Sequence, residues 1–176
     1  MKWQRFVLMC GLLSLCAAMR LLPHPPNVTP VGAMAIFAGA MFVDRRVAML
    51  APLVVLGASD LVIGGYWLMP VVYGSMLISV LIGRLIATSR FFGHVAVATF
   101  VGATQFFIIT NLACWWSFYP HSLEGLADCF TLAIPFFQNS LAGDALFSTG
   151  LFGAVWLAEK SIPSVRAGAP AVIAIT

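Results

Sequence analysis

Apolar residues fill long runs of the chain, and short polar or proline-containing breaks separate one run from the next. A helix of about 20 apolar residues is long enough to cross the roughly 30 Å hydrocarbon core of a bilayer. The runs predict helices over residues 3–22, 31–43, 47–63, 71–88, 95–116 and 139–158. We therefore expect an all-α integral membrane protein with six transmembrane helices in one compact bundle, forming a single domain over residues 1–176.

The break after the first run is unlike a helix. Residues 20–30 read RLLPHPPNVTP, and four of these eleven residues are proline. Proline lacks the backbone donor that a helix needs and pushes the preceding residue toward extended conformations. We predict a stiff, polar loop at one membrane face, which we call the proline loop.

The second run is short. Its 13 residues span only about 20 Å of helix, so it must be tilted, extended by its flanks or held among partners. Gly32, Ala35 and Gly39 share one face in the pattern that lets another helix approach closely. Another small stripe, Ser75, Ser79 and Gly83, marks the fourth run.

Residues 131–137 form an apolar piece that contains Pro135 and is too short to cross a bilayer. Irregular backbone at membrane depth survives only where protein or water covers it. We therefore expect a short interfacial or half-inserted segment just before the sixth helix.

Composition supports this interpretation. Of 176 residues, 61% are hydrophobic and 9% are charged, whereas soluble domains carry about 25% charged residues. The mean hydropathy is +1.00. The net charge of +3 is small and scattered, which argues against nucleic-acid binding. The sequence predicts neither a metal site nor a cofactor.

Six spans place seven of the nine basic residues on one side, which the positive-inside rule makes cytoplasmic. The N-terminal run resembles a signal peptide, but its removal would break this pattern, so we interpret it as the first span. We expect a multi-pass protein of a bacterial inner membrane with both termini cytoplasmic. The seven residues are Lys2, Arg5, Arg45, Arg46, Arg90, Lys160 and Arg166.

This topology puts the remaining polar residues in the outer half. Charges inside a membrane are costly and tend to face a bundle interior or a watery cavity. We predict an outward-facing substrate pocket under the proline loop, around which Arg20, Asp60 and Asp144 approach one another. Each aspartate also has a structural alternative, such as pairing with Arg20 or tying helices together. The candidate binding residues are Arg20, His24, Asn27, Asp60, Tyr73, Asn111, His121, Asn139 and Asp144.

Two of the four cysteines, Cys114 and Cys129, bracket the longest predicted loop on the outer side. A bridge between them would contribute on the order of 3 kcal/mol by the loop-entropy model. Two free thiols are the alternative. Cys10 and Cys16 point to different faces of the first helix and read as ordinary packing residues.

The run R-x-x-P-H-P-P-N-V-T-P-V-G-A-M-A-I-F-A-G-A, followed by A-P-L and S-D-L-V-I-G, resembles a family of small uncharacterised bacterial membrane proteins. The resemblance extends over F-F-I-I-T-N, I-P-F-F-Q-N and G-D. More distantly, the chain resembles the substrate-binding S components of energy-coupling factor (ECF) vitamin transporters. It shares with them six spans, a Pro/Asn loop after the first helix, and a Gly/Ala helix leading to an acidic residue.

The S-component resemblance implies uptake of a vitamin or another small micronutrient, with the proline loop covering the pocket. It also implies a transmembrane coupling protein and ATPases as partners. S components often dock through Ala-x-x-x-Ala on the first helix, where this chain has Ser14-x-x-x-Ala18, so a solitary transporter stays open.

The sequence is also compatible with two other function classes. The first is a small accessory or structural subunit of a larger membrane complex. The second is an intramembrane enzyme, because a pair of aspartates suggests aspartyl protease chemistry, in which two carboxylates share a proton. The motifs Gly-x-Gly-Asp, Gly-x-Ser-x-Gly and His-Glu-x-x-His are all absent from the sequence, so we do not expect an enzyme.

Overall fold

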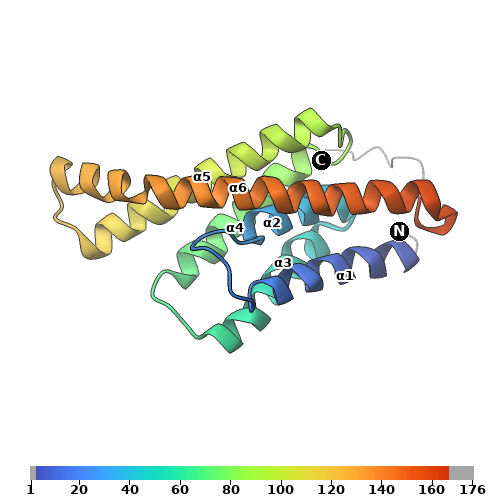
Figure 1. The fold of residues 1–176 in the computed structure, drawn as a ribbon, viewed down its shortest axis with the longest axis horizontal. Coiled ribbons are helices and arrows are strands. Elements are labelled where there is room, and N and C mark those ends of the chain that lie inside the picture. The colour runs from blue at the N-terminus through green and yellow to red at the C-terminus, as the bar shows by residue number, and fades with distance from the viewer. Residues whose placement is uncertain (1–2, 167–176) are drawn as a thin grey trace.

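Six helices run back and forth along the long axis of the molecule (Figure 1). The structure is a computed structural model and describes residues 3–166. The start of α1 and the end of α6 lie at the same end of the molecule. The helices are α1 (Trp3–Met19), α2 (Val31–Met41), α3 (Arg45–Ile63), α4 (Met69–Leu85), α5 (Phe92–Phe118) and α6 (Leu123–Ser161), followed by a short 3-10 turn, η1 (Pro163–Val165).

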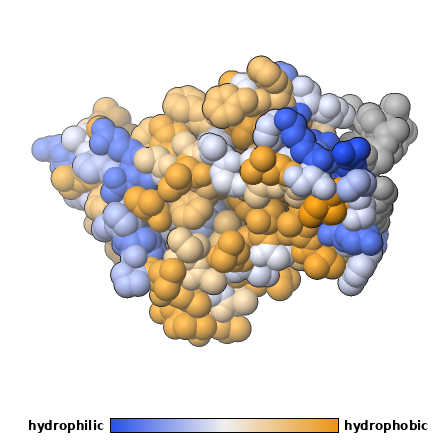
Figure 2. Space-filling view, turned by 45° about the vertical axis from the view of Figure 1, so that its right-hand side comes forward, coloured by the Kyte–Doolittle hydropathy of each residue, from blue (hydrophilic) through white to orange (hydrophobic). Residues whose placement is uncertain are grey.

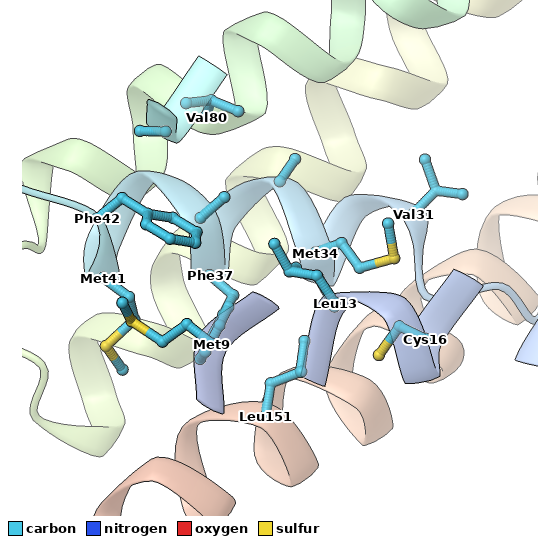
Figure 3. Packing of buried hydrophobic residues seen from close by; sticks show 14 of the residues in the cluster. Met9, Leu13, Cys16, Val31, Met34, Phe37, Met41, Phe42, Val80 and Leu151 are labelled. Carbon is cyan, nitrogen blue, oxygen red and sulfur yellow. The ribbon is translucent and has the colours of Figure 1, made fainter. Parts of the chain in front are cut away.

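The short helix α2 is the centre of the fold. Ten of its 11 residues are buried, and it contacts each of the other five α-helices. Figure 3 shows Met34 and Phe37 of α2 packed near Met9 and Leu13 of α1 and near Leu151 of α6. Because protein surrounds it, α2 does not need the length of a helix that faces lipid on its own.

Small residues allow α2 and α4 to cross at backbone contact. A methyl group added at Gly39 would overlap the carbonyl oxygen of Val80 on α4. A methyl group added at Gly83 of α4 would in turn overlap the carbonyl oxygen of Ile36 on α2. The predicted close approach at Gly39 is therefore confirmed, and the stripe on α4 supplies its partner surface.

The expectation of a separate interfacial segment before the sixth helix is wrong. Residues 131–137 lie inside α6, which continues through Pro135 for 39 residues, about 58 Å. A proline removes one helix donor, but neighbouring helices can support the helix around it. Here α5 does so, with the Phe107 ring 5.5 Å from Phe130 and 4.8 Å from Phe137 between centroids.

Three helices, α3, α5 and α6, are long and apolar enough to cross a membrane. Helices α1 and α4 have 17 residues each and are shorter. Figure 2 shows hydrophobic side chains across the middle of the visible face and hydrophilic ones gathered toward its two ends. An apolar band between two polar ends is the surface expected of a protein that sits in a bilayer.

The proline loop is non-helical, as predicted. Helix α1 ends at Met19, three residues earlier than the pattern indicated, and the chain then turns through hydrogen bonds from Arg20 N to Ala17 O and from Leu21 N to Ala18 O. Asn27 has a φ of 63°, a left-handed conformation that asparagine tolerates better than most residues. Pro30 then precedes the first residue of α2.

Candidate functional site

Three of the predicted binding residues meet where α1, α3 and α4 come together. Arg20, in the turn after α1, lies with its Nη2 atom 2.9 Å from Oδ1 of Asp60 on α3. The Tyr73 hydroxyl on α4 donates to Asp60 Oδ2 at 3.0 Å. Arg20 Nη1 also donates to the hydroxyl of Ser59. The prediction that Arg20 and Asp60 approach each other is confirmed.

Asp60 is only 3% exposed, so its charge depends on these partners. An unpaired charge in such a place is expensive, whereas a paired and hydrogen-bonded one is tolerated. Arg20 approaches Oδ1 without pointing an N–H at it, and within residues 3–166 this oxygen accepts no well-directed hydrogen bond. The carboxylate therefore keeps unused acceptor capacity.

A cavity of about 460 Å³ lies beside this ion pair and opens to the surface. A methyl group added at Gly64 or Gly65 would meet no atom within 4 Å, and one at Gly57 would meet only Tyr73 Oη, at 3.4 Å. Packing does not require glycine at these three positions, and the absence of side chains there leaves the cavity empty. The lining residues are Gly57, Asp60, Leu61, Gly64, Gly65, Met69 and Tyr73.

Tyr66, in the loop between α3 and α4, lies close enough to Asp60 and Arg20 for their charges to act on its hydroxyl. Burial raises the pKa of its hydroxyl above the ordinary value, and the Asp60 carboxylate raises this pKa further while Arg20 lowers it. A tyrosine hydroxyl is already protonated at neutral pH at its ordinary pKa of about 10, and the increase in pKa leaves it so. It is therefore a hydrogen-bond donor near Asp60.

A second cluster on α6 holds the proline loop and the start of α2. Asp144 Oδ1 accepts a hydrogen bond from Ala33 N at 2.9 Å, and Asn139 Nδ2 donates to Pro26 O at 3.0 Å. Gly143 lies against Val28, where an added methyl group would come within 3.2 Å. A carboxylate at a helix N-terminus satisfies a free donor and complements the helix dipole.

Asp144 therefore caps α2 and does not join Arg20 and Asp60 as predicted. Both aspartates thus make the structural contacts that the sequence left open, since Asp60 pairs with Arg20 and Asp144 ties two helices together. Asp60 also lines a cavity.

Asp144→Ala should lower the free energy of unfolding by about 1–3 kcal/mol, because the buried Ala33 N–H loses its acceptor. Asp144→Asn should retain most of the stability, because an amide oxygen can accept the same bond. Denaturant unfolding of both variants in detergent would measure the difference. Equal losses for the two would mean that the charge, and not the cap, matters.

The other predicted site residues lie elsewhere. His24 is exposed and its Nδ1 lies 2.6 Å from Leu22 O, and Asn27 is exposed in the proline loop. Asn111 Nδ2 donates to Phe107 O in its own helix, at 2.7 Å. His121 lies between α5 and α6 and stacks on Trp116, with ring centroids 4.5 Å apart. The single pocket expected around all nine residues therefore separates into distinct clusters.

Sequence reasoning missed Gln105, which joins α5 to α4. Its Nε2 atom donates to Ser79 Oγ at 2.8 Å and to Ser75 O at 3.1 Å, while Ser75 Oγ donates to its Oε1 at 3.1 Å. The serine stripe was visible in the sequence. The sequence signal for Gln105, the partner of these serines, was a single glutamine within an apolar run.

Cys114 and Cys129 face each other across α5 and α6. Both are free thiols, and their side chains lie close to each other. Cys129 is buried, and its Sγ lies 3.5 Å from Asn111 O, one helical turn from Cys114. The loop that these residues were expected to bracket is instead mostly helix, and the helical hairpin itself brings them together.

We expect this pair to form a disulfide when purified protein is treated with oxidised glutathione. Alkylation of the denatured, unreduced protein should then label two cysteines, Cys10 and Cys16, and intact mass would count the labels. Cys129→Ser should leave Cys114 without its partner and restore reactivity there. Four labels after oxidation would rule the bridge out.

The chain belongs to a family of unknown function, DUF6580, whose model matches residues 1–165. This match agrees with the resemblance to an uncharacterised family. Neither a curated protein nor a solved structure matches the chain.

Proposed function

We propose that this member of DUF6580 is a membrane-embedded, S-component-like protein that binds a vitamin or other small micronutrient for uptake. The observation that carries the proposal is the open cavity beside the buried Arg20–Asp60 pair and Tyr73. Ligand sites are typically concave and mostly apolar, with a few placed polar groups. The volume of about 460 Å³ is in the range for a small molecule.

The chemistry of the lining favours a ligand that donates hydrogen bonds. Arg20 balances the charge of Asp60, so the ligand need not be an ion. Asp60 and Tyr73 line the cavity, so an N–H or O–H group could approach the carboxylate on its Oδ2 side, and Leu61 and Met69 offer apolar contact. We therefore expect a compact, partly apolar molecule with at least one such donor.

The proposed topology has six helices crossing a bacterial inner membrane, with both termini cytoplasmic. The proline loop follows the end of α1 that points away from the chain's N-terminus, and the α5–α6 hairpin extends beyond it along the long axis (Figure 1). Helix α2, although only 11 residues long, can serve as a crossing because the other helices shield it from lipid.

The proline loop is proposed to cover the ligand. Asn139 and Gly143 of α6 hold one side of the loop, whereas the Asn27 side chain is exposed. Since Asn27 has a positive φ, Asn27→Ala would also strain the backbone, and Asn27→Gly is the cleaner test of its side chain. Weaker ligand binding with unchanged thermal stability in Asn27→Gly would support the lid.

An ECF-type coupling protein with its ATPases is the proposed partner. Ser14 and Ala18 are both exposed on α1, four residues apart and therefore on one face, where a partner helix could approach. A solitary transporter would leave this face to lipid.

Native mass spectrometry of the purified protein, with a search for a retained small molecule, tests the proposal. Gly57→Leu should fill the cavity and abolish retention, because its side chain would extend from α3 into the open space beside Tyr73. Gly74→Leu is the matched control, since it adds the same side chain to open space on α4 outside the cavity. Retention by Gly57→Leu at the wild-type level would contradict the proposal.

The shape of the molecule also favours a second candidate, an accessory subunit of a larger membrane complex. The hairpin of α5 and α6 extends beyond the other helices (Figure 1). It carries exposed Leu132, Ile134 and Phe136. Co-purification of a stable complex that is lost on Phe136→Ser, with no retained small molecule, would favour this candidate.

A further inference from the structure

A second cavity, of about 520 Å³, lies between the first turns of α5 and the second half of α6. The start of α5 diverges from α6 at the end of the molecule where α6 finishes (Figure 1). The cavity is partly open, so it forms a groove between the two helices, remote in sequence from the Asp60 cavity. We call it the α5–α6 groove; its apolar lining includes Phe91, Val95, Phe100, Leu141, Phe152 and Trp156.

The few hydroxyls in this groove already have partners. Thr99 Oγ1 donates to Ser148 Oγ at 3.0 Å, and Thr149 Oγ1 donates to Ala145 O at 2.8 Å. No side-chain amide or carboxylate lines the groove. Its interior therefore suits a hydrocarbon chain better than a polar molecule.

Two cationic side chains, those of Arg90 and Lys160, lie at one end of the groove. Arg90 is part of the lining, and Lys160 Nζ lies 3.7 Å from the ring centroid of Trp156, which is also part of it. The salt bridges within residues 3–166 join Arg5 to Glu159 and Arg20 to Asp60, so neither Arg90 nor Lys160 has a carboxylate partner there.

Arg5 adds further positive charge nearby. Its Nη2 contacts Met41 Sδ at 3.7 Å, and Arg90 Nη1 contacts the same sulfur at 3.1 Å. Two guanidiniums thus converge near one carboxylate, Glu159, which leaves a surplus of positive charge at the mouth of the groove. Such a surplus favours a phosphate group.

We propose that the α5–α6 groove binds an anionic phospholipid, with one acyl chain between the helices and the headgroup phosphate held by Arg90 and Lys160. The apolar interior and the cationic end match the two parts of such a lipid. Charge complementarity selects the anionic lipid over a zwitterionic one, since each basic residue near a membrane surface attracts anionic lipid. The site is independent of the proposed micronutrient cavity.

The test uses delipidated, detergent-solubilised full-length protein titrated with phosphatidylglycerol or phosphatidylcholine carrying the same acyl chains. Native mass spectrometry counts bound lipids. Gly153→Leu would fill the groove, because a methyl group added at this lining residue meets no atom within 4 Å. Gly150→Leu is its control on the same helix, with equally open space and no part in the lining.

Charge is tested separately with Arg90→Gln, and Arg45→Gln removes one exposed cation outside the groove as its control. We expect Gly153→Leu to lose retained lipid of both kinds. Arg90→Gln should lower the preference for phosphatidylglycerol about fivefold, while both controls behave as wild type.

Unchanged lipid binding by Gly153→Leu would overturn the proposal. So would an equal loss of preference in Arg90→Gln and Arg45→Gln, which would indicate a general surface charge effect. A copurifying protein chain that occupies the groove instead of lipid would also overturn it. Thermal unfolding of every variant, compared with Gly150→Leu, separates loss of lipid from loss of fold.

Discussion

A Gly39→Ala variant should be among the least stable single substitutions in this protein. The added methyl group would overlap the Val80 carbonyl oxygen and approach the Arg84 backbone nitrogen on α4 at 3.0 Å. Backbone atoms cannot move aside as the end of a flexible side chain can, so α2 would have to shift within the core. Overpacking typically costs about 1–3 kcal/mol, and we expect the upper end of that range or more.

The comparison for Gly39→Ala is Gly11→Ala on α1, where an added methyl group meets no atom within 4 Å. In a helix, alanine is favoured over glycine by about 1 kcal/mol, so this control should be neutral or stabilising. Gly83→Ala should behave like Gly39→Ala, because it meets the Ile36 backbone from the opposite side. Unfolding midpoints in detergent report the result, and wild-type stability of Gly39→Ala would refute the packing at this crossing.

Arg20→Met should be comparably harmful. It leaves the Asp60 carboxylate, only 3% exposed, without its counter-charge. Breaking a buried ion pair by removing one partner costs about 3–5 kcal/mol, because an uncompensated charge stays buried. Tyr73 would still donate to Asp60, but one neutral hydrogen bond does not replace the guanidinium.

The double variant Arg20→Met with Asp60→Leu decides whether the loss comes from the unpaired charge. A hydrophobic pair of similar volume can replace a buried ion pair at little cost. We therefore expect the double variant to be more stable than Arg20→Met alone. If the two single losses simply add, Arg20 and Asp60 are not coupled and the ion pair does not hold this corner together.

The positions of most helices were predictable from the sequence because the signals are local. Apolar runs and the prolines of residues 20–30 act through the few residues around them, and they placed five of the helices to within a few residues. The sixth failed because the effect of Pro135 depends on what packs beside it. With α5 alongside, α6 continues through this residue.

The candidate site, too, was predictable from the sequence only in part. Topology placed Arg20 and Asp60 at one depth, and the high cost of an unpaired charge made their pairing predictable. Asp144 has the same character in the sequence, yet its partner is a backbone donor at the start of α2, which no side-chain pattern reveals.

The sequence by itself determined an apolar, helical protein with a stiff proline loop and buried charges that need partners. Only the tertiary structure decided which helix is central. It is the shortest one, because Gly32 and Gly39 on α2 and Gly83 on α4 let other helices approach it closely. The same packing brings Cys114 to Cys129, joins Gln105 to the serines of α4 and opens the α5–α6 groove. Such contacts join residues far apart along the chain, so they depend on how whole helices cross and not on any local pattern.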